Sequence, residues 1–226
     1  MTEIQQNLQK VLQSLPNEGV RLVAVSKFNP MTAIEEAYAV GQRLFGESHA
    51  QELVPKAQAL PKDIQWHFIG HLQTNKVKQV VPYVSCIESV DSDRLLAEID
   101  KQAAKIGRVV DCLLQFHVAR EETKFGFGFD ECCAMLQSER FASLRNVRIT
   151  GIMGMASITG DETQLRSEFG RLKAYFDALK TRFFASEPAF CELSMGMTHD
   201  YPIAVGEGAT LVRVGSGIFG ERMYQH

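Results

Sequence analysis

A lysine follows the first short apolar run of the chain. The run at residues 22–25, LVAV, leads directly into Ser26 and Lys27, and Pro30 then ends any regular structure. A lysine at the end of a strand usually extends its flexible stem into solvent and has no chemical role. The same amine can have a lowered pKa and form Schiff bases when apolar walls surround it. The function therefore depends on which other groups lie near Lys27.

Two turns near the end of the sequence are rich in glycine and hydroxyl side chains, which are the residue types that bind anions. Glycine lets a backbone come close to an anion, and successive backbone amides form a concave binding site. Most turns of this composition are only turns. The candidate residues are Ser194, Gly196 and Met197 in the first turn, and Arg213, Gly215 and Ser216 in the second.

Short apolar runs alternate with helical patterns, and these elements must position the candidate residues. The runs are rich in Val, Ile, Leu or Phe and are bounded by turn residues, as expected of parallel strands covered on both faces. An opening helix is predicted over residues 1–16, another over 95–106 and a long one over 165–183. The predicted strands are 21–26, 43–46, 66–70, 84–90, 109–118, 147–155, 190–197 and 211–214.

This alternation within 226 residues predicts the α/β class and a single (β/α)8 TIM barrel with an extra N-terminal helix. We expect one domain over residues 1–226. A doubly wound sheet is the alternative, but KFNP follows the first strand where that fold has a glycine-rich fingerprint. A barrel places its active face at the strand C-termini and binds phosphate after strands seven and eight. Glu221 and Arg222 are expected to begin a final helix whose N-terminus faces the anion.

A Schiff-base lysine across the barrel mouth from a phosphate site suits pyridoxal 5'-phosphate, whose aldehyde and phosphate must both be held. A cofactor-free Schiff-base aldolase would use the same two features. A protein-interaction module that uses the barrel only as a scaffold would need neither of them.

The bulk composition excludes several other classes. The chain is 45% hydrophobic and 23% charged, and its net charge of -3 gives no field that attracts nucleic acid or an anionic membrane. No apolar run approaches the roughly 18 residues of a membrane span, and the polar N-terminus does not read as a signal peptide. The odd number of cysteines, without a CxxC spacing, predicts reduced thiols and a cytoplasmic location.

Several other candidates are set aside. His67 and His71 are four residues apart, but they flank a predicted strand and lack the HExxH glutamate, so no metal site is expected. His71 and Lys124 are read as loop residues, and Asn75 as the entry to a helix. The residues interpreted as exposed helix charges are Lys56, Lys76 and Lys78.

Seven segments of the chain, in order, are AVSKFNP, FGESHAQE, WHFIGHLQTNK, TKFGF, ITGIMGM, LSMGMTHDY and RVGSGIFGER. Together they resemble the YggS/PROSC family of pyridoxal phosphate homeostasis proteins. The resemblance implies a barrel like the N-terminal domain of alanine racemases, with Lys27 carrying the cofactor as an aldimine. It also implies that the SMGM and RVGSGIFG segments hold the phosphate and ring, with Arg213 near the pyridine nitrogen. Ser48 stands where the family usually has asparagine, and the Phe28–Asn29 pair after the lysine replaces a more usual Thr-Lys type of pair.

The resemblance implies a carrier or regulator in intracellular vitamin B6 homeostasis rather than a catalyst, with PLP-dependent apoenzymes as possible recipients. Racemisation needs two proton-transferring groups on opposite faces of the substrate. In the racemases the second group comes from a β domain, for which we expect no room after the last strand. Without that domain the protein is also expected to be a monomer. A racemase-like enzyme of low activity remains the alternative.

Overall fold

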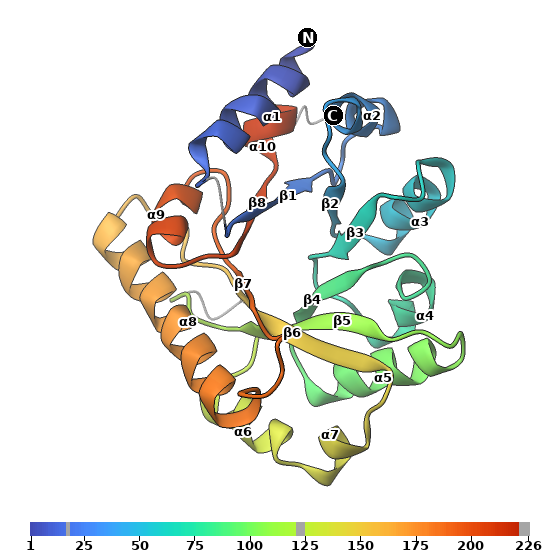
Figure 1. Ribbon diagram of the computed structural model, residues 1–226, viewed down its shortest axis with the longest axis vertical. Coiled ribbons are helices and arrows are strands. Elements are labelled where there is room, and N and C mark those ends of the chain that lie inside the picture. Colours follow the sequence, from blue (N-terminus) through green and yellow to red (C-terminus); the bar gives the residue numbers. More distant parts are fainter. Residues whose placement is uncertain (17–18, 121–124, 222–226) are drawn as a thin grey trace.

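Eight parallel strands close into a barrel in the order β1 to β8, each hydrogen-bonded to the next and β8 to β1. The computed structural model describes residues 1–16, 19–120 and 125–221. The predicted (β/α)8 barrel is confirmed, and Figure 1 shows the strands as an inner ring with helices outside. The strands are β1 Arg21–Val25, β2 Leu44–Glu47, β3 Gln65–Phe68, β4 Cys86–Val90, β5 Val110–Phe116, β6 Val147–Gly154, β7 Glu192–Ser194 and β8 Leu211–Val214.

The helices begin where capping side chains satisfy their first amides. Thr2 caps the N-terminal helix, Ser92 caps the helix predicted near residue 95, and Asp161 caps the long helix. The helices are α1 Glu3–Ser14, α2 Met31–Ala39, α3 Ala50–Ala59, α4 Val77–Val80, α5 Asp93–Ala104, α6 Phe129–Leu136, α7 Glu139–Ser143, α8 Glu162–Phe183, α9 Tyr201–Gly206 and α10 Ser216–Phe219, with a 3-10 turn η1 at Thr74–Lys76.

Alternation along the strands divides the buried side chains between the barrel lumen and the helix layer. A small apolar cluster fills part of the lumen, and a much larger one lies between the strands and the helices. In β1, for example, Val23 and Val25 belong to the inner cluster, whereas Leu22 and Ala24 belong to the outer one. Alternate residues of β1 therefore face the barrel lumen and the helix layer.

The ends of the last two strands differ from the prediction. β7 covers only Glu192–Ser194. The Met195 N–H and the Gly196 carbonyl still bond to β8, and the chain turns at Gly196, which has a φ of +91°. The final helix α10 begins at Ser216, five residues earlier than expected at Glu221, and Arg222 lies outside the described residues. The helix α10 lies beside α1 (Figure 1), and Asn7 Nδ2 of α1 donates to the carbonyl of Ile218 in α10 at 3.4 Å. Among the helices described, none combines the length and apolarity required to cross a membrane.

Candidate functional site

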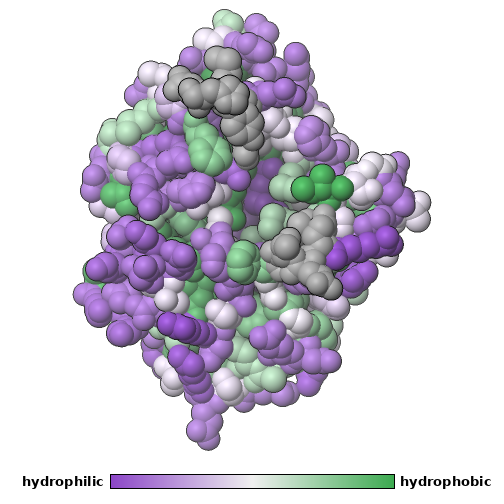
Figure 2. Space-filling model, turned by 180° about the vertical axis from the view of Figure 1, so that it is seen from behind, coloured by the Kyte–Doolittle hydropathy of each residue, from purple (hydrophilic) through white to green (hydrophobic). Residues whose placement is uncertain are grey.

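A cavity of about 240 Å³ opens at the C-terminal ends of the strands, where a barrel carries its active site. It brings together five of the residues predicted from the sequence. Apolar side chains, including Ile69 and Met155, form part of its wall. Hydrophilic residues cover much of the molecular face in Figure 2, and hydrophobic residues gather around a hollow near its centre. The predicted residues that line the cavity are Lys27, Met197, Arg213, Gly215 and Ser216.

Lys27 lies in a tight turn just after β1, and its neighbours hold that turn. Phe28 has a φ of +65°, a left-handed conformation that is rare for a residue with a side chain. Its N–H donates to Glu52 Oε2 at 2.6 Å, and Asn29 Nδ2 donates to the Lys27 carbonyl at 3.1 Å. A residue held in this region stores about 1–3 kcal/mol of strain, which the surrounding contacts must offset. The backbone that carries the Lys27 amine is therefore fixed on both sides.

Lys56 on α3 is a buried residue, so its interpretation as an exposed helix charge was wrong. Its Nζ donates to Glu47 Oε1 at 2.8 Å, to the Ser26 carbonyl at 3.0 Å and to Glu52 Oε2 at 3.1 Å. Ser26 Oγ donates to the same Glu47 oxygen at 2.6 Å. The network joins α3 to the ends of β1 and β2 directly beside Lys27. Burial raises the pKa of Glu47, and the charge and hydrogen bond of Lys56 oppose that rise.

Three donors converge on one oxygen at the end of β8. The backbone N–H groups of Gly215 and Gly217 and the hydroxyl of Ser216 reach Thr198 Oγ1 at 3.4, 3.3 and 3.3 Å. We call residues 215–217 the β8 turn. Thr198 also lines the cavity. Convergent amide and hydroxyl donors of this kind suit an oxygen of a phosphate group.

Ser194 and Gly196 were predicted in the anion site, but neither lines the cavity. Ser194 is buried in the barrel lumen, where its Oγ accepts from Arg213 Nη1 at 2.5 Å and donates to Glu88 Oε2 at 2.5 Å. Glu88 Oε1 in turn lies 2.6 Å from His67 Nδ1. Because β4 and β7 are not neighbours, the Glu88–Ser194 bond crosses the lumen. We call His67, Glu88, Ser194 and Arg213 the lumen chain.

Charge in the lumen chain follows from what each group can donate. Arginine has no acceptor, so Ser194 accepts from Arg213 and gives its own proton to Glu88. Burial lowers the pKa of Arg213 from its usual value, and the charge of Glu88 partly offsets that effect. Burial also pushes the pKa of Glu88 upward, but His67, Arg213 and Ser194 outweigh it, so the Glu88 pKa lies below its usual value. Glu88 is therefore the carboxylate counter-ion of a guanidinium that lines the cavity.

The remaining candidates fall in three groups. Ser48 lines the cavity next to Lys27. His71 lies outside its lining, where its Nδ1 is 2.9 Å from Asp91 Oδ2 and its ring stacks on Phe125, and Asn75 sits in the turn η1. Lys124 lies outside the described residues. Within the described ranges, no three His, Cys, Asp or Glu side chains are placed to hold a metal ion.

Sequence reasoning missed the lumen chain and the Lys56 network. Glu88 lies in the fully buried strand CIESV, two residues from the inward Cys86, and this spacing was the signal for a charge in the lumen. Nothing in the sequence near Lys56 distinguished it from an exposed lysine.

Comparison with known proteins identifies relatives along nearly the whole chain. The family "Alanine racemase, N-terminal domain" matches residues 1–223. The pyridoxal phosphate homeostasis protein of Aquifex aeolicus is 38% identical over 205 residues, covering 90% of this chain and 88% of that protein. The mouse protein of the same name is 37% identical over 232 residues, covering 98% and 84%.

Solved structures of similar proteins also match this chain over most of its length. PipY of Synechococcus elongatus without PLP superposes with a TM-score of 0.89 at 36% identity, covering 96% of this chain and all of that chain. The structure of PipY with PLP bound gives 0.86 at the same identity and coverage. Alanine racemase of E. faecalis, at 19% identity and a TM-score of 0.72, shares the fold over 97% of this chain and 58% of its own. The chain thus belongs to the family of pyridoxal phosphate homeostasis proteins, built on the alanine racemase N-terminal domain.

Proposed function

We propose that this protein binds pyridoxal 5'-phosphate in the cavity at the strand C-termini, with the phosphate at the β8 turn and Lys27 as the point of covalent attachment. The observation that carries the proposal is the convergence of three donors on Thr198 Oγ1 in the cavity that Lys27 also lines. Bonds of 3.3–3.4 Å are long, and a phosphate oxygen would accept shorter, charge-assisted ones. The relative PipY, with PLP bound, supports the same assignment.

The residues of the chain divide the work of binding. When bound, pyridoxal phosphate supplies an aldehyde that condenses with a primary amine, with loss of water, and an electron-withdrawing ring. Lys27 presents its amine from a backbone that Glu52 and Asn29 hold. Ile69 and Met155 would give the bound ring an apolar wall that excludes water. Arg213 is oriented by Ser194 and by the Gly154 carbonyl, to which its Nη2 donates at 3.0 Å.

We propose a role in PLP homeostasis as a carrier or regulator rather than a catalyst. Arg213 can only donate, so a ring nitrogen that meets it stays unprotonated, and the ring is then a weaker electron sink. Glu88 and Ser194 hold the guanidinium in that role from behind. Besides Lys27 and Arg213, the residues that the structure describes place one ionisable side chain in the cavity lining, the exposed His199. The names of the relatives agree with a homeostatic role.

We also propose the recipients of the cofactor, the oligomeric state and the location of the protein. PLP-dependent apoenzymes are the proposed recipients of the cofactor, and the protein is proposed to act as a monomer in the cytoplasm. All five cysteines are free, as a reducing compartment would keep them. Gel filtration with and without PLP tests the monomer, and transfer of PLP to an apoenzyme separated by a dialysis membrane tests whether recipients need contact.

A spectral titration tests the binding proposal. Protein freed of cofactor is titrated with PLP and, as the matched control, with pyridoxal, which has the aldehyde but no phosphate. We expect visible absorbance with PLP and affinity for pyridoxal at least about a hundredfold weaker, because two or more charge-assisted hydrogen bonds are lost. Equal affinity for the two compounds would remove the β8 turn from the site. Absence of any visible band would favour the cofactor-free aldolase instead.

A further inference from the structure

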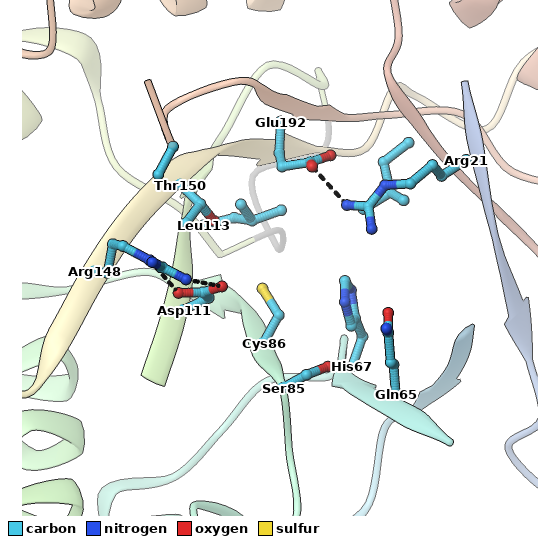
Figure 3. A pocket seen from close by; sticks show the side chains of 12 residues that line it. Arg21, Gln65, His67, Ser85, Cys86, Asp111, Leu113, Arg148, Thr150 and Glu192 are labelled. Atoms are coloured by element: carbon cyan, nitrogen blue, oxygen red, sulfur yellow. Dashed lines mark hydrogen bonds and ion pairs between the residues drawn. The ribbon is translucent and has the colours of Figure 1, made fainter. Parts of the chain in front are cut away.

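A second cavity opens at the opposite end of the barrel, where the strands begin. Its volume is about 380 Å³, larger than the cavity at the strand C-termini. Figure 3 shows its polar lining, which comes from the first residues of several strands. The residues that matter here are Arg21, His67, Asp111, Arg148 and Glu192.

Two ion pairs face each other across this second cavity (Figure 3). Arg21 Nη2 lies 2.5 Å from Glu192 Oε1 on one side. Arg148 binds Asp111 on the other, with Nε to Oδ1 at 2.7 Å and Nη2 to Oδ2 at 2.9 Å. A guanidinium has five N–H donors, so each arginine keeps donors beyond the bonds of its pair. The lining therefore offers two cations and two carboxylates, with no net formal charge.

His67 adds a hydrogen-bond acceptor at the inner end of the cavity. Its ring extends from β3 into the space between the ion pairs (Figure 3) and is only 5% exposed. The Glu88 carboxylate can only accept, so the imidazole donates to it from Nδ1, and in the uncharged ring that tautomer leaves the lone pair on Nε2. Nε2 then carries a lone pair toward the cavity. Among the described residues, the hydrogen bond to the His67 ring is made at Nδ1.

We infer that the second cavity binds a small zwitterion, a molecule with a primary ammonium and a carboxylate on a short spacer. The ammonium donates to His67 Nε2 and to Asp111 or Glu192. The carboxylate accepts from the spare donors of Arg21 or Arg148. A singly charged molecule meets only half of this pattern, and a lining without net charge gives it no compensating long-range attraction.

The occupant of the second cavity would touch the lumen chain. His67 lines the second cavity and Arg213 lines the first, and Glu88 and Ser194 join them by hydrogen bonds through the barrel. A zwitterion bound to His67 therefore shifts the environment of Arg213, and the linkage is reciprocal. This part of the inference rests on the proposed function, because Arg213 reports on a bound cofactor.

Binding to the second cavity is measured on protein without added cofactor, so the result does not depend on the PLP proposal. Isotope-labelled protein is titrated with glycine, β-alanine, 4-aminobutanoate and 5-aminopentanoate and followed by NMR. We expect saturable shifts of backbone amides at the starts of β1, β3, β5 and β6 with at least one of them. Acetate and methylammonium should bind at least about tenfold more weakly, because each lacks one set of charge-assisted bonds.

Matched variants test whether the ion pairs hold the ligand. Arg148→Gln should weaken zwitterion binding about tenfold. Arg140→Gln should leave zwitterion binding unchanged. Arg140 forms a similarly exposed ion pair with Asp93, 2.8 Å long, and neither residue of that pair lines the second cavity. Absence of saturable shifts with every zwitterion, equally tight binding of acetate, or no effect of Arg148→Gln would overturn the site. A saturating zwitterion should also change the visible spectrum of the PLP-loaded wild type more than that of PLP-loaded Arg148→Gln, because direct reaction of its amine with PLP is common to both proteins. Equal changes in the two proteins would overturn the link.

Discussion

Replacing Glu88 with glutamine removes one negative charge from the barrel lumen and keeps the size of the side chain. Glu88 is fully buried, and its two oxygens accept from Ser194 Oγ and lie against His67 Nδ1. Glutamine offers one acceptor and one donor group in place of two acceptors. In Glu88→Gln, one of these two neighbours therefore faces a donor, and Arg213 loses the carboxylate counter-ion that lies 3.7 Å away.

The loss of stability in Glu88→Gln follows from the charge that stays behind. Removing one partner of a buried ion pair destabilises a protein by about 3–5 kcal/mol. Arg213 keeps bonds to Ser194 Oγ and the Gly154 carbonyl, and Glu88 lies beyond direct contact, so the lower end of that range applies. We expect a free energy of unfolding lower by about 3 kcal/mol, which is a urea midpoint lower by about 1 M or more.

The difference between wild type and Glu88→Gln also has a predicted pH dependence. The pKa of Glu88 in the folded protein lies below its usual 4.5. A depressed carboxyl pKa stabilises the fold above the unfolded value, and that contribution is lost as pH falls through the folded value. The gap between the two urea midpoints should therefore be full at pH 6–7 and shrink once the pH drops below the usual value of 4.5.

Urea unfolding followed by circular dichroism at several pH values measures this gap. Glu162→Gln is the matched control, because it makes the same change in an exposed ion pair with Arg166 and should move the midpoint little. A Glu88→Gln loss below about 1 kcal/mol at pH 7 would refute an ionised Glu88 paired with a buried Arg213. A gap that widens in acid would refute the direction of the Glu88 pKa shift.

Three further substitutions test other parts of the structure. Lys56→Met removes the cation that pairs with the buried Glu47. It should lower the free energy of unfolding by about 3 kcal/mol at pH 7 and by less at pH 5, where Glu47 takes up a proton more readily. Thermal unfolding measures both losses, and equal losses at the two pH values would contradict this reasoning. Gly151→Ala places a Cβ 1.8 Å from a carbonyl oxygen of the neighbouring strand and should prevent stable folding, whereas Gly160→Ala meets nothing within 4 Å and should fold normally by circular dichroism. Gly215→Val narrows the phosphate site and should weaken PLP binding about tenfold or more without unfolding the barrel, since one or more charge-assisted bonds are lost. A spectral titration measures the affinity, and an unchanged value would exclude the β8 turn from the PLP site.

The fold was predictable because the alternation of apolar runs and helical patterns is repeated along the chain and can be recognised in short segments. Each apolar run is bounded by turn residues, and all eight predicted strands are found within a few residues of their expected bounds. The ends were less predictable. β7 is shorter than expected because the chain turns at Gly196, and α10 starts at Ser216 because a single residue, Gly215, separates it from β8. Such ends depend on backbone conformation at single residues, which composition does not reveal.

The candidate site was predictable only where the fold dictates position. Strand ends placed Lys27, Arg213 and the β8 turn around one cavity, as the barrel requires. Ser194 was misplaced because strand alternation turns it into the lumen, where Arg213 and Glu88 occupy its hydroxyl. Lys56 was misread because its partners come from β1, β2 and its own helix. Contacts between distant segments decide these roles, and a single sequence carries no direct record of them.

Borohydride reduction of the PLP-loaded protein, followed by peptide mapping, tests the central claim most directly. Reduction fixes the cofactor on whichever amine holds it, and mass spectrometry identifies the lysine. Attachment through the turn after β1 predicts the phosphopyridoxyl group on Lys27, and its absence from the reduced Lys27→Ala variant. A modification found on Lys76 or Lys124 in the wild-type protein, or on no lysine at all, would contradict the account.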